Sequence, residues 1–530
     1  MAVAVSLFFG TKNIHAQFLT GANFSGSFET KNQLFRTDNN IGATVPNDKI
    51  GSNNYLKLDF SKGIFVAGMR YEAYLPVIFG YSPLYNGNKI VNRFFGIRKD
   101  KFELTVGNFY EQFGSGLVFR AYEDRQLGID NSVDGVSIKF NIIEPVTIKA
   151  IYGKQRLGME TGNGIIRGID AELDVFGLLK SNTANYLSVS GSLVSRYEAY
   201  TGGLSTVPEN VTAYSARFDF VAGNFGLNSE YVQKSSDPHL LNKYSYRKGR
   251  TLLINSSYSL EGMGMNVNLR RTENMDFRAE REAVNSDLLI NYVPGLSKQH
   301  KYSVLNLYPY AVQSNNEIGG QIDFYATVPK GTFLGKNYGT LISANFSTYY
   351  EMDTVATTNA EAFNSDFFAV SKTKYFHDFN VEIEKKWSKK LKTTLTYANI
   401  YYNKTKLEGE AYEIVKSNSV VADFLYLINE KNSLRVELSH LATKTDYLNW
   451  VGAMVEYGVA PYFTCFVSDL YNYQGNKRAH YYNTGFAISK GDLNFSLRYG
   501  RQKKGVLCVG GVCTQVPAFS GFVAGLTVAF

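Results

Sequence analysis

The sequence predicts an all-β protein that forms one transmembrane antiparallel β-barrel of about 26 strands, within a range of roughly 22 to 26. Three observations support this prediction. Apolar and polar residues alternate with a period of two, aromatic residues reach 15% with 38 Tyr and 37 Phe, and short polar turns recur between longer polar loops. Strands with one lipid-facing side and aromatic girdles at the membrane interfaces produce this combination.

The alternation is plain in several segments, among them 102–107, 136–141, 434–439 and 493–500. Each has one apolar face and one polar face, as a strand does when its two sides meet different surroundings. A soluble sandwich would give the same pattern, so the number of strands and the lengths of their connections must separate the two folds. No stretch approaches the roughly 18 apolar residues that a transmembrane helix needs.

Turns and loops differ in length, which gives the barrel two different ends. Short turns are predicted at 61–63, 99–101, 143–145, 222–224, 261–262, 388–390, 429–432 and 490–492, with others near 181, 297, 333 and 460. Longer polar loops are predicted at 37–50, 75–90, 198–209, 236–246, 352–370, 403–411 and 503–518. We expect short periplasmic turns, long extracellular loops and periplasmic termini, so about 12 turns correspond to about 26 strands.

The first residues are interpreted as the residual part of a signal peptide, 1–16. Residues 2–10 are apolar, and Ile14-His15-Ala16 is a small-residue cleavage site before Gln17. Residues 17–530 are then expected to form a single outer-membrane β-barrel domain. The bacterial cell outer membrane is the expected location, and three cysteines in the whole chain fit an exported protein.

A polar segment between two predicted strands, 108–135, contains Leu117, Val118 and Phe119, which are unsuited to free solvent. We therefore expect an inward-folded loop at about 113–130. Charged residues in and near it are the candidate pore or constriction residues: Glu111, Arg120, Glu123, Asp124, Arg125, Arg156, Arg167 and Asp170. They either face a narrowed passage, where opposed charges select solutes, or pair with one another and anchor the loop to the wall. The two interpretations are compatible with each other.

Cys508 and Cys513 lie in the loop before the last strand, with Val-Gly-Gly-Val between them. Two glycines allow a tight reversal, so a local disulfide is favoured in an oxidising compartment. A zinc site is disfavoured because the remaining cysteine is Cys465 and no histidine lies close in sequence.

The sequence contains no pattern that indicates an enzyme. Ser439 and His440 are adjacent and so point to opposite faces of their strand, where they cannot pair. No catalytic, cofactor-binding or metal-binding residues are assigned, since no P-loop, dinucleotide fingerprint, EF-hand or CxxC is present. A nucleic-acid partner is not expected because the 55 Lys and Arg are spread evenly, with a net charge of +8.

The last residues also alternate, with Leu526, Val528 and Phe530 on one face and an aromatic residue at the end of the chain. This segment resembles the C-terminal signal strand of bacterial outer-membrane barrels. The resemblance implies contact with outer-membrane lipid and recognition by the barrel-assembly machinery during biogenesis.

Longer motifs resemble a family of Bacteroidota outer-membrane β-barrel proteins without an assigned function. They include GSNNYLKLDF (51–60), VGNFYEQFGSGLVFRAYEDRQLGIDNSVDGV (106–136) and CVGGVC (508–513). The resemblance implies an outer-membrane, porin-like barrel and supplies no catalytic or ligand residues.

The leading hypothesis is a porin-like channel or passive transporter narrowed by 113–130. The alternative is a non-enzymatic barrel subunit of a Bacteroidota cell-envelope secretion or outer-membrane assembly complex, with partners in that complex. A third hypothesis, a surface adhesin or receptor, would use the loops 352–370 and 503–518.

Overall fold

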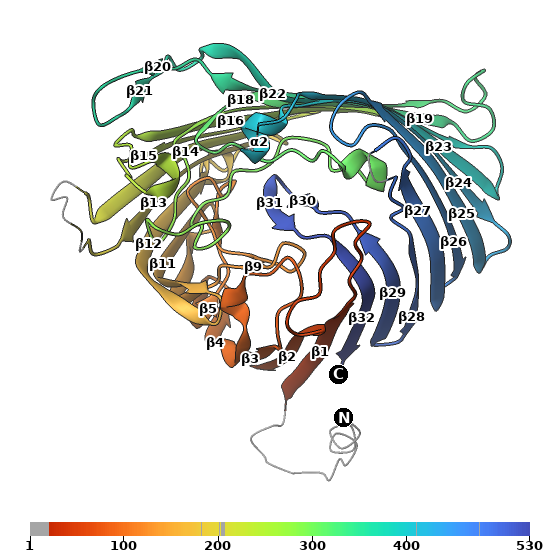
Figure 1. The fold of residues 1–530 in the computed structure, drawn as a ribbon. Helices are drawn as coiled ribbons and strands as arrows, with labels where there is room; N and C mark the ends of the chain where they lie inside the picture. The colour runs from red at the N-terminus through yellow and green to blue at the C-terminus, as the bar shows by residue number, and fades with distance from the viewer. Residues whose placement is uncertain (1–20, 182, 201, 203–206, 410, 476–477) are drawn as a thin grey trace, which may run out of the picture.

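A computed structural model describes residues 21–181, 183–200, 202, 207–409, 411–475 and 478–530, and these form a closed antiparallel barrel of 24 strands (Figure 1). Each strand pairs with its neighbours, and the last strand pairs with the first to close the ring. The predicted all-β barrel is confirmed, and its strand number lies inside the predicted range. The predicted leader, 1–16, lies outside the described residues. Among the described residues, no helix is long and apolar enough to cross a membrane.

The wall strands follow the ring in chain order. They are β1 (Ala22–Phe35), β2 (Ile50–Lys62), β3 (Phe65–Tyr74), β4 (Gly87–Lys99), β5 (Phe102–Phe109), β10 (Val133–Ile143), β11 (Val146–Leu157), β12 (Glu160–Asp174), β13 (Tyr186–Tyr197), β14 (Asn210–Ala222), β15 (Phe225–Lys234), β16 (Gly249–Leu260), β17 (Met263–Glu273), β18 (Asn316–Val328), β19 (Thr340–Met352), β22 (Val370–Lys386), β23 (Leu391–Tyr402), β24 (Val415–Leu427), β25 (Asn432–Thr443), β26 (Trp450–Val459), β27 (Phe463–Asn472), β28 (Asn483–Lys490), β29 (Leu493–Gln502) and β32 (Phe519–Ala529).

Short elements lie in the connections between wall strands. They are β6 (Gln112–Phe113), β7 (Phe119–Arg120), β8 (Glu123–Asp124), β9 (Ile129–Asp130), β20 (Val355–Ala356), β21 (Phe363–Asn364), β30 (Gly505–Val509), β31 (Val512–Val516), α1 (Val175–Leu178), α2 (Lys404–Glu408), η2 (Pro83–Tyr85), η3 (Leu240–Asn242) and η4 (Ser303–Asn306).

Alternation along each wall strand separates an outward face from a lumen face. In β25, Leu438 is 51% exposed and points outward, whereas the adjacent Ser439 is 7% exposed and points into the lumen. The closing strand β32 follows the same rule. Its Val528 is paired with the outward Phe28 of β1 and Leu493 of β29. The period of two therefore builds a barrel with an apolar outer surface.

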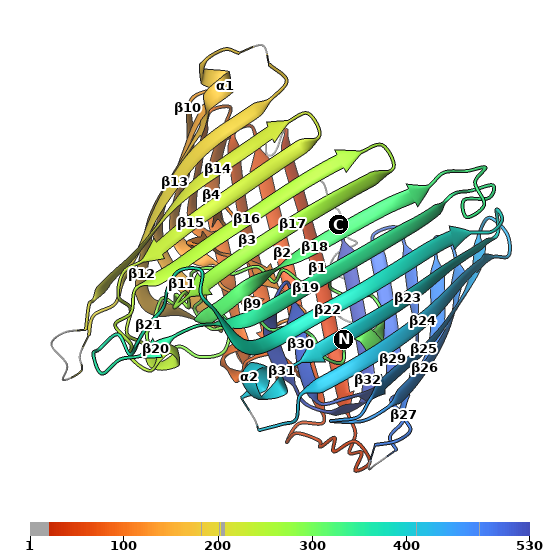
Figure 2. The ribbon, with the colours of Figure 1, turned by 90° about the horizontal axis from the view of Figure 1, so that it is seen from above.

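The two ends of the barrel differ. Eleven connections lie at the end that also carries Phe530, and most of them are turns of two to four residues. We call this the turn end. The opposite end, the loop end, carries the long connections, although β11 and β12 are joined there by Gly158 and Met159 alone. Figure 2 shows the strands running obliquely between these two ends.

The predicted turn near 297 is wrong, and this accounts for the difference between about 26 strands and 24. Residues 274–315 contain no wall strand and form one long connection between β17 and β18 at the loop end. Their apolar residues, such as Met275, Phe277 and Ile290, are fully buried inside the protein. The segment contains as many apolar residues as a wall strand would, because these residues pack in a core inside the barrel.

We predict that Leu438→Arg destabilises the folded barrel by about 2–4 kcal/mol, because a charge near the middle of the lipid-facing surface is costly. Glu430→Arg, in the turn between β24 and β25, is the control and should change stability by less than about 0.5 kcal/mol. Denaturant titration of both variants in lipid bilayers measures the difference. Equal stability of the two would contradict the outward orientation of Leu438.

Candidate functional site

Three connections from the loop end fold into the lumen and pack on one another (Figure 1). They are 110–132, 274–315 and the hairpin 505–516, and together we call them the plug. Arg120 N donates to Ile290 O at 2.8 Å, and Tyr292 N donates to Gly116 O at 2.9 Å. Gly295 N donates to Gly510 O at 2.8 Å, which joins the second connection to the third. The plug is thus a small backbone-bonded structure inside the ring.

An apolar core joins the plug to the wall. Leu117, Val118 and Phe119, the residues that predicted inward folding, are fully buried in it. They belong to one cluster with residues of 274–315 and with lumen-facing wall residues near the loop end, such as Val232 of β15. At about 25 cal/mol per Å² of apolar surface, burial of this kind is the main term that holds the plug in place.

Two buried arginines of the wall hold the first connection of the plug. Arg156 of β11 lies 2.6 Å from Asp130 Oδ2 and 2.6 Å from Glu72 Oε2. Arg70 of β3 contacts the same two carboxylates at 2.5 Å and also Glu123 at 2.9 Å. Burial alone would raise the pKa of Asp130, but Arg156 and Arg70 outweigh it and hold that pKa below its usual value. We call these five residues the anchor network.

The three carboxylates of the anchor network are close enough together to be considered as a metal site. Carboxylate oxygens of Glu72, Glu123 and Asp130 lie within 4.8 Å of one another, a spacing that could suit a cation. Arg70 and Arg156 already supply the positive charge and the hydrogen-bond donors that these oxygens need. The donor set therefore fits an ion-pair network, and no metal is assigned to it.

Other predicted constriction residues also pair with the wall or with their own loop. Glu111 lies 2.9 Å from Lys149 of β11, and Arg125 pairs with Glu123 at 2.8 Å and with Glu29 of β1. Since each side chain has a partner, these charges tie the plug to the barrel.

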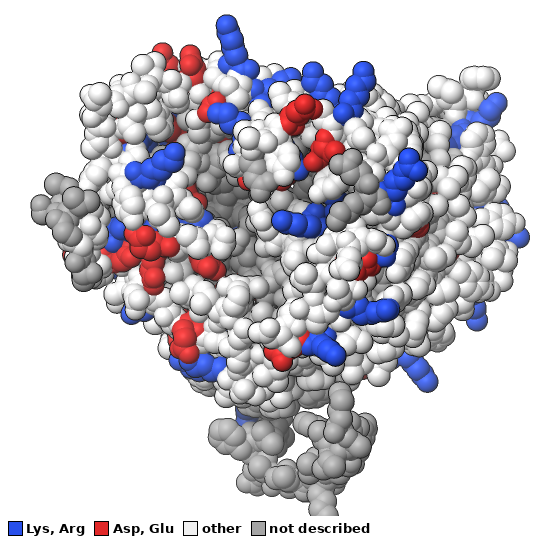
Figure 3. All heavy atoms as spheres, viewed as in Figure 1, with Lys and Arg blue, Asp and Glu red and all other residues white. Residues whose placement is uncertain are grey.

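Arg120, Asp124 and Asp170 have local partners. The Arg120 guanidinium lies over Tyr122 and Tyr292, at 4.6 and 4.1 Å from the ring centres. Asp124 accepts hydrogen bonds from two backbone N–H groups of its own turn. Asp170, on the wall, pairs with Arg217 at 2.6 Å. Figure 3 shows both basic and acidic side chains distributed over this face of the molecule.

The predicted position of Arg167 at the constriction, beside Asp170, is wrong. The two residues are three positions apart on β12, so their side chains lie on opposite sides of the wall. Asp170 is buried on the lumen side, whereas Arg167 is exposed on the outer face and donates to Asn210 Oδ1 at 2.8 Å.

The contribution of 274–315 to the plug was not predicted from the sequence. This connection reaches across the lumen to the wall, where His300 Nε2 lies 2.6 Å from Asp378 and Tyr302 donates to Asp423 at 3.2 Å. Two prolines, Pro294 and Pro309, were the available signal, because proline removes a ladder hydrogen bond from any central strand.

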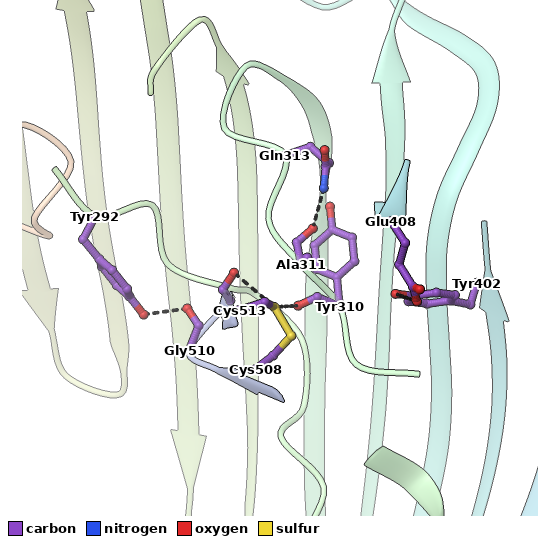
Figure 4. Close-up of a disulfide and its surroundings, with 10 residues drawn as sticks. Tyr292, Tyr310, Ala311, Gln313, Tyr402, Glu408, Cys508, Gly510 and Cys513 are labelled. Atoms are coloured by element: carbon purple, nitrogen blue, oxygen red, sulfur yellow. Dashed lines mark hydrogen bonds between the residues drawn. A yellow bond between two sulfur atoms is a disulfide. The ribbon is translucent and has the colours of Figure 1, made fainter. Parts of the chain in front are cut away.

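The third connection of the plug is closed by a disulfide (Figure 4). Cys508 and Cys513 are bonded across the β30–β31 hairpin, with Cα atoms 4.1 Å apart. Gly510 and Gly511 at its tip have φ of 56° and 87°, values that glycine adopts without steric cost. Tyr292 donates its hydroxyl to Gly510 O at 2.6 Å, which ties the hairpin to 274–315. Cys465 is free and lies on β27.

The lumen towards the turn end differs from the plugged half. Its wall carries hydrogen-bonded polar side chains, among them Asn255, which donates to Asn228 at 3.0 Å. A space of about 490 Å³ between the plug and the wall is lined by polar residues, among them Lys149. Side chains of this kind favour contact with water.

His239 is a buried group of the loop end that lies outside the plug. Its two ring nitrogens have no hydrogen-bond partner among the described residues, and the ring is 3% exposed. Burial, followed by the nearby Lys234, lowers the pKa of His239 to about 4. This histidine is therefore neutral at physiological pH.

The sequence matches one family model, and the fold is distantly similar to several solved structures. The model of a family described as "Family of unknown function (DUF6029)" matches residues 1–530. No curated protein matches the sequence.

Similar solved structures are barrels of low identity. One is the P pilus usher (PapC) translocation pore, with 10% identity, 95% of this chain and 99% of that chain covered, and a TM-score of 0.46. Another is the siderophore receptor PirA from Pseudomonas aeruginosa, with 8% identity, 96% and 80% coverage, and a TM-score of 0.40. A third is OccAB3 from Acinetobacter baumannii, with 10% identity, 96% and 99% coverage, and a TM-score of 0.37.

We predict that Asp130→Ala destabilises the barrel by about 3–5 kcal/mol, because it leaves Arg70 and Arg156 short of a buried partner. The control is Lys89→Ala, which removes an exposed ion pair with Glu160 and should cost less than about 1 kcal/mol. Equilibrium unfolding in detergent micelles compares the two. A cost for Asp130→Ala as small as that of the control would refute the anchor network.

We predict that stability falls by up to about 3 kcal/mol as the pH decreases from about 6.5 to about 4, owing to His239. The folded-state pKa lies below the unfolded value, so this contribution is present above pH 6.5 and is lost as the unfolded histidine takes up a proton. Unfolding midpoints measured across this pH range should show the loss, and His239→Gln should reduce it. An identical pH profile for wild type and variant would contradict the assignment.

Proposed function

The chain belongs to the DUF6029 family of unknown function, and we propose that it is a bacterial outer-membrane β-barrel that provides a passage for solutes, closed at the loop end by its own plug. The proposal has two parts, the location and the passage, and different features support each.

Location in an outer membrane is supported by closure and by the outer surface. A closed ring leaves no unpaired strand edge, which lipid requires. Large apolar side chains are exposed on the outward face of the wall, including Leu438 and Val467 at 51% and 55%. The outward Leu526, Val528 and Phe530 lie on the closing strand or at its end, which suits the strand that a barrel-assembly machinery recognises. We expect the turn end to face the periplasm.

The passage is supported by one observation above all, the division of the lumen into two halves. An apolar core fills the loop-end half, while polar side chains line the turn-end half and leave water-accessible space beside the plug. Each plug connection joins the wall at both ends and is otherwise held by packing, ion pairs and hydrogen bonds. Displacement of the plug within these tethers would open the barrel to solutes.

The filled loop-end half also favours a second candidate function. A barrel without a conducting path could serve as a non-enzymatic subunit of a Bacteroidota cell-envelope secretion or assembly complex, with its loops as docking surfaces. The connection 353–369 suits such a role because it presents Val355 and Phe368 at 69% and 72% exposure.

Single-channel recording in planar bilayers separates the two functions. We expect the wild type to be mostly closed and deletion of 114–128 to raise the conductance at least severalfold, because that segment fills the lumen core. Deletion of 354–368, a segment of equal length in a loop outside the ring, is the control and should leave conductance unchanged. A folded 114–128 deletion that stays silent would contradict the passage, and stoichiometric partners in detergent pull-downs would then support the complex subunit.

A further inference from the structure

Three arginines gather around one carboxylate on the outer surface of the barrel, at the loop end of β16 and β17. Arg247 Nε lies 2.5 Å from Glu273 Oε1, while Arg250 Nη2 and Arg271 Nη2 lie 2.8 and 2.5 Å from Glu273 Oε2. We call Arg247, Arg250, Arg271 and Glu273 the rim cluster. Its wall members face away from the lumen, because Thr251 and Thr272, their sequence neighbours, pair on the lumen side.

The rim cluster carries more positive than negative charge. Glu273 is fully buried, and both of its oxygens are already shared among the three guanidinium groups. Glu361 reaches Arg247 at 3.5 Å but is 46% exposed, so it compensates weakly. Arg271 Nη1 is buried and has no hydrogen-bond partner among the described residues. Arg247 and Arg271 also donate to the connection 353–369, at Phe363 O, Ser365 Oγ and Phe367 O. The cluster therefore has the charge to attract an additional anion, and the partly exposed Arg250 supplies the donor that such an anion can reach.

The position of the rim cluster suits the boundary between lipid tails and headgroups. The next outward residues toward the turn end are apolar, among them Leu269 at 48% exposure. Phe367, from the connection 353–369, lies over Arg271 at 4.4 Å and over Arg250 at 5.6 Å from its ring centre. Figure 1 shows this connection, with β20 and β21, outside the ring. Aromatic residues are enriched at that boundary in transmembrane barrels.

We propose that the rim cluster binds a phosphate group of an anionic lipid headgroup in the outer leaflet. Guanidinium groups match phosphate oxygens through paired N–H donors, and a phosphate would neutralise the excess charge around Glu273. Free phosphate shares this chemistry. A lipid is favoured because the apolar surface of Phe367, Phe368 and Leu269 lies beside the cluster, where acyl chains would pack. The inference rests on the outer-membrane location and does not depend on the passage.

Native mass spectrometry of the purified full chain in uncharged detergent tests this inference. The probes are diphosphoryl lipid A, its fully dephosphorylated form and inorganic phosphate. We expect retention of the phosphorylated lipid, with weaker retention of the other two. Arg250→Ala should weaken binding of the phosphorylated lipid about tenfold, the equivalent of one lost charge-assisted contact. Arg250→Lys, which keeps the charge, should lose less.

Arg167→Ala is the matched control, since Arg167 is also exposed on the outer wall but lies on β12, outside the rim cluster. It should bind the phosphorylated lipid as the wild type does. Equal retention of the two lipids, unchanged binding by a folded Arg250→Ala, or tighter binding of inorganic phosphate than of the lipid would each overturn the proposal. Lipid binding is independent of the proposed passage, so a barrel that does not conduct would still be expected to bind the phosphorylated lipid.

Discussion

Closure of the wall is the constraint from which the rest of the structure follows. An antiparallel ring of 24 strands gives every strand a hydrogen-bonded neighbour on both sides and leaves no open sheet edge, which the interior of a membrane demands. Closure at this strand number also creates a lumen much wider than side chains from the wall can fill. The protein fills the loop-end part of that lumen with chain from its own loops. The plug is therefore a consequence of the barrel's width as well as a candidate gate.

The plug is held by two kinds of interaction with different physical properties. Apolar packing around Leu117 and Phe119 stabilises the plug in proportion to the surface that it buries, but it does not require one particular orientation of the packed groups. The anchor network fixes the position of the plug, because the guanidinium groups of Arg70 and Arg156 donate to the Asp130 carboxylate in one geometry. Buried ion pairs contribute little net stability but cost much when one partner is lost. This combination favours one defined position of the plug over many loosely packed ones.

Much of the barrel could be predicted from local patterns, and the failures have physical causes. Alternation and turn chemistry located the wall because both depend on neighbouring residues, and Leu117, Val118 and Phe119 indicated inward folding because solvent cannot accommodate them. The segment 274–315 was mistaken for wall because a lumen core and a lipid surface both favour apolar residues. Pro294 and Pro309 could have corrected this. Arg167 could have been excluded by its odd separation from Asp170. The partners of Asp130, at positions 70 and 156, depend on the ring order and could not be read from spacing.

The central claim is that loop segments form a packed structure inside the closed ring, and hydrogen–deuterium exchange in detergent micelles tests it most directly. Six backbone amides of 116–121 and 288–295 donate to carbonyl oxygens within the plug, so they should exchange nearly as slowly as those of the wall strands: Gly116, Arg120, Ala121, Ile290, Tyr292 and Gly295. Exchange of both segments at the rate of free peptide, with the wall strands still protected, would show an empty lumen and contradict the account.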